Sequence, residues 1–241
     1  MKIATWNLNN RVGMVRFRPE AAHAAISVNA DVIVFNEYYP QEASGEFQDI
    51  LKDHGWSHQC LSEDCGVKAN RVLIASRFEL RQNTTPPPVF DKQFSSNWLC
   101  VDVPEFGITV AGIRVPWYSN KTPELISQSW DWLENFAHQN LDQPTLMLGD
   151  FNARLNSPAS RGGAHLRRIL SLDWHRAGFG TGSSYFGSGE SRSEIDHILA
   201  NSKCTFSNSR YVTACENYVL AGDTNAISDH ALLCSDVQIC N

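Results

Sequence analysis

Short runs of apolar residues recur along the chain and are separated by polar stretches. This arrangement is typical of strands that alternate with turns and helices. The run at residues 31–37 is almost continuously apolar, as expected for a strand that is covered on both faces. Strands are predicted at residues 2–8, 31–37, 71–78, 96–103, 107–115, 144–150, 194–200, 205–214 and 230–239.

Three other segments have the pattern of helices. Residues 122–139 place an apolar side chain at every third or fourth position, as a helix with one buried face does. Pro19 suits the first turn of a helix over residues 19–28, and a shorter helix over residues 45–55 is predicted to end at Gly55. Because the helices are dispersed among more numerous strands, the pattern predicts a layered sheet sandwich with helices outside.

Two stretches of the sequence are predicted to be irregular. Residues 84–94 contain three consecutive prolines and form a loop or an edge segment. Residues 178–191 are rich in glycine and serine and are predicted to be a loop. Neither resembles a linker between domains, so one domain is expected over residues 1–241.

The composition is that of an ordinary globular protein, with 42% hydrophobic and 19% charged residues. No apolar run approaches the length needed to span a membrane, and the first ten residues lack the apolar region of a signal peptide. We therefore expect a cytoplasmic protein with no membrane segment, and a monomer rather than an oligomer.

The formal net charge of −6 weighs against a protein whose main task is to coat duplex DNA. It is compatible with an enzyme that meets phosphates in one locally cationic cleft, especially where a metal ion supplies charge. Four arginines close together in sequence form either a phosphate-binding rim or a solvated loop and helix face: Arg154, Arg161, Arg167 and Arg168.

Seven cysteines show no regular framework. His54, His58, Cys60 and Cys65 are four potential zinc ligands within one short segment, but their spacing fits none of the usual paired-ligand zinc patterns. We expect these residues to lie in a loop without binding a metal.

Acidic, amide or imidazole side chains stand at the ends of several predicted strands. Carboxylates that converge at strand ends repel one another unless a cation lies among them, and hard oxygen ligands favour Mg²⁺ or Mn²⁺ over zinc. Alternation along a strand would put Asp150 and Asn152 on one side and Phe151 on the other. The residues concerned are Asn7, Glu37, Asp150, Asn152, Asp196, Asp229 and His230.

The ordered set of motifs TWN, NE, GDFN, SEIDHI and SDH resembles the endonuclease/exonuclease/phosphatase superfamily, whose fold is that of DNase I and exonuclease III. The match in order and spacing runs from Asn7 to His230, nearly the whole chain. The resemblance implies a four-layered α/β sandwich, in which helices flank two central mixed β-sheets. It also implies metal-assisted hydrolysis of a phosphate ester by water, with the active site at one end of the sheets.

The resemblance assigns a role to each motif residue. Glu37 is the principal metal ligand, with Asn7 and Asp229 beside it and Asn9 as a further candidate. Asp150 positions and deprotonates the attacking water. Asn152 donates to a phosphate oxygen. His230 contacts the scissile phosphate, and Asp196 orients His230. His197 should face away from the site and is interpreted as structural.

Two positions depart from the family pattern. Asn36 stands where glutamine is frequent, which affects only a contact behind the metal ligand. Arg114 stands where the family commonly has tyrosine or histidine. Either Arg114 clamps phosphate oxygens, or it occupies an exposed strand position and pairs with a surface acid. Trp117 and Tyr118 follow at once and could stack on a base, although aromatic residues are more often packing residues.

Three functions are compatible with these residues. The first is a Mg²⁺-dependent nuclease that cleaves DNA or RNA with modest sequence specificity. The second is a phosphoesterase for a small-molecule or lipid phosphate ester, which the acidic balance favours. The third is a binding or scaffold domain without activity, and the presence of every core residue argues against it.

Overall fold

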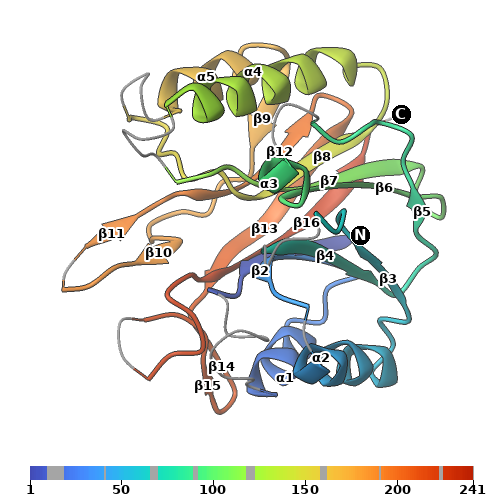
Figure 1. Ribbon diagram of the computed structural model, residues 1–241, viewed down its shortest axis with the longest axis vertical. Helices are drawn as coiled ribbons and strands as arrows, with labels where there is room; N and C mark the ends of the chain where they lie inside the picture. The colour runs from blue at the N-terminus through green and yellow to red at the C-terminus, as the bar shows by residue number, and fades with distance from the viewer. Residues whose placement is uncertain are drawn as a thin grey trace.

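Two six-stranded β-sheets lie face to face, and helices cover their outer faces (Figure 1). The computed structural model describes residues 1–9, 19–40, 42–65, 70–88, 92–117, 123–157, 162–189, 191–222 and 225–240. No helix of these described ranges is long and apolar enough to cross a membrane.

The first sheet contains strands from both ends of the chain. β1 runs parallel to β2 and antiparallel to β16, so the sheet is mixed. In spatial order its strands are β13 (Cys204–Val212), β16 (Leu232–Ile239), β1 (Lys2–Asn7), β2 (Val32–Tyr38), β4 (Arg71–Ser76) and β3 (His58–Leu61).

The second sheet is also mixed, because β7 and β8 are parallel and their neighbours are antiparallel. In spatial order its strands are β5 (Arg81–Gln82), β6 (Trp98–Val103), β7 (Ile108–Arg114), β8 (Thr145–Asp150), β12 (Asp196–Asn201) and β9 (Trp174–Arg176). Two short hairpins lie outside the sheets, β10 (Tyr185–Phe186) with β11 (Arg192–Ser193) and β14 (Ala214–Cys215) with β15 (Tyr218–Val219).

Three apolar layers hold the sheets and helices together. The inner layer lies between the sheets and includes Val32 and Val34 of β2, while Ile33 and Phe35 pack on the other side against α1 (Glu20–Ser27) and α2 (Glu42–Asp53). A third layer packs the second sheet against α4 (Pro123–Gln139) and α5 (Gly163–Leu170). The predicted four-layered α/β sandwich, with β2 buried on both faces, is confirmed (Figure 1).

The structure adds elements that the sequence pattern did not predict. α2 begins at Glu42 rather than near residue 45, and α5 lies within the arginine-rich stretch. The proline-rich stretch ends in a short helix, α3 (Lys92–Ser95). The glycine- and serine-rich stretch carries β10, so it is partly a hairpin and not only a loop.

The topology brings the predicted functional residues to one end of the sandwich. In the second sheet Asp150 lies opposite Arg114 on one side and opposite Asp196 on the other. In the first sheet Asn7 ends β1 and pairs with Asn36 of β2. Because β12 and β16 are antiparallel to their neighbours, their first residues meet the last residues of β8 and β1 at this end.

Asn36 joins the two sheets at the same end. Its Nδ2 donates to Ile113 O at 2.8 Å, and its Oδ1 accepts the backbone N–H of Asp150 at 3.2 Å. Gly149 leaves the space for this contact, because a Cβ there would stand 2.0 Å from Ile113 O and 2.7 Å from Asn36 Oδ1.

Replacing Gly149 with alanine should destabilise the protein by at least about 2 kcal/mol, because the methyl group collides with backbone and φ is 142°. Urea unfolding measures this change. Gly45→Ala is the matched control, since nothing lies within 4 Å of a Cβ at Gly45 in α2. It should raise stability by about 0.5–1 kcal/mol. Equal stability of the Gly149→Ala variant and the wild type would contradict the close approach.

Candidate active site

Asp150, the last residue of β8, is buried and held by several donors. Its Oδ2 accepts hydrogen bonds from Asn7 Nδ2 at 3.0 Å and from Asn152 Nδ2 at 3.1 Å. Its Oδ1 accepts the backbone N–H of Asn152 at 2.9 Å. These bonds orient the carboxylate, as a base that positions a water molecule requires. That role stays a prediction.

Asn152 lies beside Asp150, but for a different reason from the expected one. Strand β8 ends at Asp150, and Asn152 has a left-handed φ of 47°, so a turn and not strand alternation brings the two side chains together. Asn152 Nδ2 also donates to Val115 O at 2.8 Å. Both amide hydrogens are thus engaged within the protein, and donation to a phosphate would require one bond to be exchanged. Phe151 points away into the core, as predicted.

His230 and Asp196 form the predicted imidazole–carboxylate pair, with Nδ1 of His230 2.8 Å from Oδ2 of Asp196. The backbone of His230 is held by two further bonds. Its N–H donates to Ser228 Oγ at 3.0 Å, and its carbonyl accepts Trp6 Nε1 at 2.9 Å. The pair leaves Nε2 as the ring nitrogen that can meet a substrate.

The hairpin strand β10 supports this pair and was missed by sequence reasoning. Ser184, just before β10, accepts the backbone N–H groups of Ile195 and Asp196 on its hydroxyl, each at 2.9 Å. The ring of Tyr185 packs on His230 with centroids 5.0 Å apart. The available signal was the aromatic pair of Tyr185 and Phe186 in an otherwise glycine- and serine-rich stretch.

The clustered carboxylates of the site shift the pKa values of Asp150 and His230. Burial and the neighbouring charge of Asp196 raise the pKa of Asp150 to about 7, although His230 and Arg114 oppose the change. Burial lowers the pKa of His230, but the carboxylates of Asp196, Asp150 and Asp229 outweigh burial and raise it to about 9. At neutral pH the imidazole is therefore protonated, and the site favours an additional cation.

Glu37 and Arg114 meet across the two sheets. Arg114 Nε lies 2.9 Å and Nη2 lies 2.8 Å from the same oxygen, Oε1 of Glu37. The side chains are 20% and 12% exposed for Arg114 and Glu37, so this is no surface position. Of the two alternatives for Arg114, the exposed position paired with a surface acid is wrong, because the partner of Arg114 is Glu37, the predicted metal ligand. Phosphate binding by Arg114 stays a prediction.

Asn7 and Asp229, the other predicted metal ligands, lie at the same end of the molecule. Asn7 Oδ1 accepts the backbone N–H of Asn9 at 2.8 Å, so the amide of Asn7 links Asn9 to Asp150. Asp229 Oδ1 stands 3.8 Å from His230 Nε2. Ligation of a metal by Glu37, Asn7 and Asp229 stays a prediction.

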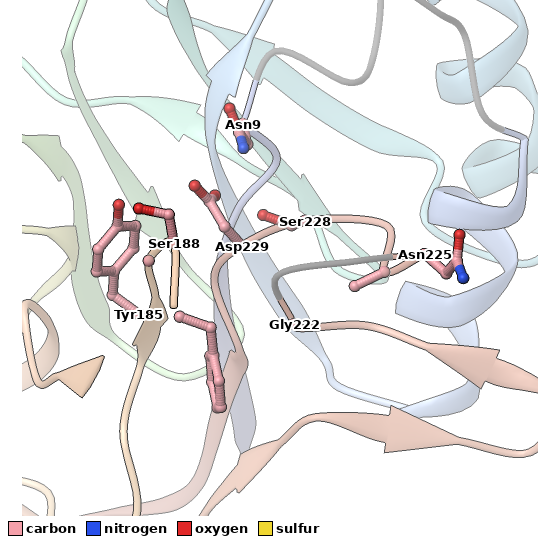
Figure 2. A pocket seen from close by; sticks show the side chains of 10 residues that line it. Asn9, Tyr185, Ser188, Gly222, Asn225, Ser228 and Asp229 are labelled. Atoms are coloured by element: carbon pink, nitrogen blue, oxygen red, sulfur yellow. The ribbon is translucent and has the colours of Figure 1, made fainter. Parts of the chain in front are cut away.

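A cavity of about 240 Å³ opens beside Asp229 and Asn9. It lies between the β10–β11 hairpin and the segment that precedes β16, and Figure 2 shows the side chains that line it. Burial and the charges of Asp229 and Asp150 raise the pKa of the lining residue Tyr185, which keeps its phenol protonated as a donor. The cavity offers room for a group attached to a substrate phosphate.

Asp150, Asp196 and His230 form a second group that could hold a metal, with one ligand atom of each within 4.8 Å of the others. Two buried carboxylates suit a hard cation such as Mg²⁺. His230 would have to release its proton to ligate a metal, because the neighbouring carboxylates raise its pKa to about 9. A bound divalent ion would neutralise charge on phosphate oxygens and polarise the leaving oxygen.

Among the described residues, the other sequence candidates make no hydrogen bond or ion pair with Asp150, Asp196 or His230. His54, His58, Cys60 and Cys65 were expected in a loop, but His58 and Cys60 lie in strand β3, which pairs with β4. Among the described residues these four are not part of a cluster of metal-ligating side chains. Arg168 pairs with Glu134 of α4 at 2.8 Å, and Arg154 and Arg167 are exposed. Arg161 and Tyr118 lie outside the described residues.

His197 is structural, as predicted. It is buried, its Nε2 donates to Ala153 O at 2.8 Å, and Nδ1 has no hydrogen-bond partner in the part of the chain that the structure describes. Burial lowers the pKa of His197 from 6.5 to about 4. Between pH 4 and 6.5 the imidazole of His197 is therefore protonated in the unfolded chain but not in the folded protein.

The stability due to neutral His197 should be present above pH 6.5 and be lost as the pH falls toward 4, by up to about 3 kcal/mol. Urea unfolding between pH 4.5 and 8 measures the difference in stability between the wild type and His197→Phe. We expect the wild type to lose its advantage over the variant as the pH falls. A difference that does not change with pH would contradict the depressed pKa.

Comparison with known proteins identifies relatives of the whole chain. A model of the Endonuclease/Exonuclease/phosphatase family matches residues 4–230. Among solved structures, a variant of the 3′ phosphatase NExo from Neisseria bound to a product DNA hairpin has a TM-score of 0.73 at 19% identity, with 99% of each chain covered. An AP endonuclease from Archaeoglobus fulgidus has a TM-score of 0.68 at 18% identity, covering 99% of this chain and 100% of that one.

A beta toxin variant from Staphylococcus aureus with bound magnesium ions has a TM-score of 0.64 at 14% identity, covering 100% of this chain and 99% of that one. Curated protein sequences give no match to this chain. The family model, the shared fold and the buried Asp–Asp–His group agree. The chain therefore belongs to the endonuclease/exonuclease/phosphatase family and is a hydrolase that acts on phosphoester bonds.

Proposed function

We propose that this protein is a Mg²⁺-dependent nuclease that cleaves phosphodiester bonds of DNA or RNA with modest sequence specificity. The observation that carries this proposal is the exposure of Trp117, which is 66% exposed and lies three residues beyond Arg114. Of the described residues, Trp117 and Val219 are the large hydrophobic ones that are exposed. An exposed indole beside a phosphate-binding site is a platform on which a base can stack.

The backbone just before Trp117 is held against the reaction centre. Val115 donates its N–H to Asp150 O at 2.8 Å, and its carbonyl accepts Asn152 Nδ2 at 2.8 Å. The indole is therefore two residues from Val115, which is bonded to the backbone of Asp150 and to the side chain of Asn152. A base that stacks there would lie next to the phosphate it carries, and such stacking contributes about 1–3 kcal/mol.

The side chains suit hydrolysis by water in the following way. Asp150 holds a water molecule and takes its proton when ionised. His230, protonated at neutral pH and oriented by Asp196, donates from Nε2 to a phosphate oxygen. Glu37, Asn7 and Asp229 would hold the Mg²⁺, which would neutralise charge on the phosphate oxygens. Two similar structures are, by their descriptions, a phosphatase bound to a DNA hairpin and an AP endonuclease, which supports a nucleic acid as the substrate.

End-labelled single-stranded DNA, duplex DNA and RNA, together with supercoiled plasmid, test the proposal. Each is incubated with the protein and Mg²⁺, and in parallel with EDTA. We expect Mg²⁺-dependent cleavage of at least one of them, and the length of the labelled products distinguishes endonuclease from exonuclease action. No cleavage of any of the four would refute the proposal.

One observation favours the second candidate, a phosphoesterase for a small-molecule or lipid phosphate ester. The cavity beside Asp229 has room for one small group, at about 240 Å³, and the chain carries a net charge of −6. Release of phosphate or of a headgroup from a panel of nucleotides, sugar phosphates and phospholipids separates the two. Turnover of a small ester without cleavage of nucleic acid would favour this candidate.

A further inference from the structure

The guanidinium of Arg114 pairs with the carboxylate of Glu37, which the family resemblance assigns to metal binding. Its Nε donates a hydrogen bond to Oε1 of Glu37 at 2.9 Å, and its Nη2 forms an ion pair with the same oxygen at 2.8 Å. The pair is largely buried, so its attraction is screened less than that of a surface ion pair. In the pairing of β7 with β8, Ile113 lies opposite Gly149 and Arg114 lies opposite Asp150.

The backbone around Glu37 aims its side chain at this partner. Glu37 lies in an irregularity of β2, where the pairing with β4 shifts between Phe35 and Tyr38, and it has a left-handed φ of 54°. A glutamate in this conformation costs about 1 kcal/mol or more and persists where its surroundings hold it. The preceding residue, Asn36, donates to Ile113 O, the residue before Arg114. Two successive contacts thus join β2 to β7, and the second is the ion pair.

A divalent cation and the guanidinium compete for the same carboxylate. Glu37 Oε1 already accepts a hydrogen bond from Nε of Arg114 and forms an ion pair with Nη2, and a metal bound there would lie close to the positive charge of Arg114. Glu37 and a phosphate also compete for the same guanidinium, because the donor fork of Arg114 matches either anion. A metal on Glu37 therefore leaves Arg114 free for phosphate, and a phosphate on Arg114 leaves Glu37 free for metal.

We propose that Arg114 is a phosphate-binding residue that pairs with Glu37 until metal and substrate bind, and that it couples the binding of metal and phosphate. When a divalent ion takes Glu37, the guanidinium passes to a phosphate oxygen of the substrate. By linkage, phosphate on Arg114 raises the affinity of Glu37 for the metal by the same factor. This inference rests on the proposed metal-dependent hydrolysis of a phosphate ester, and it does not depend on that ester being a nucleic acid.

The first test measures Mn²⁺ binding by electron paramagnetic resonance, with and without inorganic phosphate, in the wild type and in Arg114→Met. Without phosphate the variant should bind Mn²⁺ about tenfold more tightly, since the competing cation is gone. Phosphate should raise the Mn²⁺ affinity of the wild type by a larger factor than that of the variant. Direct contact between metal and phosphate persists in both proteins, so the difference between the two factors reports Arg114.

Arg81→Met is the matched control, because Arg81 pairs with Glu79 at 2.9 Å on an exposed strand away from the site. It should leave the affinity for Mn²⁺ within twofold of the wild type. Equal Mn²⁺ affinity of Arg114→Met and the wild type, with both folded by circular dichroism, would overturn the proposal.

The reciprocal test uses Glu37→Gln in metal-free protein and needs no turnover. Loss of the carboxylate releases the guanidinium, so phosphate should bind about fivefold more tightly than to the metal-free wild type in ³¹P NMR titrations. Glu37→Gln combined with Arg114→Met should abolish that gain. Phosphate affinity that is unchanged by Glu37→Gln would contradict the proposal. Neither test changes its meaning if nucleic acid proves not to be the substrate.

Discussion

Replacing Asp150 with asparagine should lower the Mg²⁺-dependent turnover by about three orders of magnitude and leave the fold intact. The amide has nearly the shape of the carboxylate but cannot take a proton from water. Asn7 Nδ2 and Asn152 Nδ2 can still donate to its oxygen, as they do to Asp150 Oδ2. The bond from the backbone N–H of Asn152 is lost, because it would face the new NH₂ group.

The stability of this variant should change in the opposite direction from its activity. The folded-state pKa of Asp150 is raised from 3.8 to about 7, so the stability due to its protonated form is present below pH 3.8 and is lost as the pH rises to about 7. At pH 8 the ionised carboxyl group carries the full cost of its burial. The neutral amide carries no such cost. In EDTA at pH 8 we expect Asp150→Asn to melt at the same temperature as the wild type or higher.

The measurement pairs initial rates on the best nucleic-acid substrate with thermal melting. Asp49→Asn, at an exposed position of α2, is the matched control and should retain wild-type turnover and melting temperature. Turnover of Asp150→Asn within tenfold of the wild type would remove Asp150 from the proposed chemistry. A loss of activity with a much lower melting temperature would show that Asp150 acts in folding instead.

Strand patterns and short motifs predicted the fold and most of the site. The apolar run of β2 predicted a strand buried on both faces, and the polar end of this run pointed to Glu37 as a site residue. The motif residues Asp150, Asp196 and His230 do lie together, because a sheet brings the ends of neighbouring strands to one edge. Local patterns carry this information since each motif lies at or next to the beginning or the end of a strand.

Contacts between the sheets were not predictable in the same way. The ion pair of Glu37 with Arg114 joins residues 77 positions apart on two sheets, and no local pattern records that distance. The turn that returns Asn152 to Asp150 depends on a left-handed φ, whereas strand alternation suggested the same neighbourhood by another geometry. Helix α5 was missed because it is only eight residues long and begins at a glycine.

Replacing Asp196 with asparagine should lower turnover at pH 7.5 by about two orders of magnitude and move the alkaline limit of activity to lower pH. Burial alone lowers the pKa of His230, and the carboxylates of Asp196, Asp150 and Asp229 raise it to about 9. Removing the carboxylate 2.8 Å from Nδ1 lets burial count for more, so the imidazole loses its proton at a lower pH.

Wild-type activity should therefore decline as the pH rises through about 9, whereas the decline of Asp196→Asn should begin at least about one pH unit lower. NMR titration of the His230 ring in metal-free protein measures the pKa without relying on turnover, and His230→Gln identifies its resonance. Asp131→Asn, on the exposed side of α4, should leave both profiles unchanged. An alkaline limit that is the same in Asp196→Asn and the wild type would mean that the proton on His230 is not used. The catalytic donor to the phosphate would then have to be sought elsewhere, and Tyr185, packed on the same ring with its pKa raised by burial, is the neighbouring group that could donate.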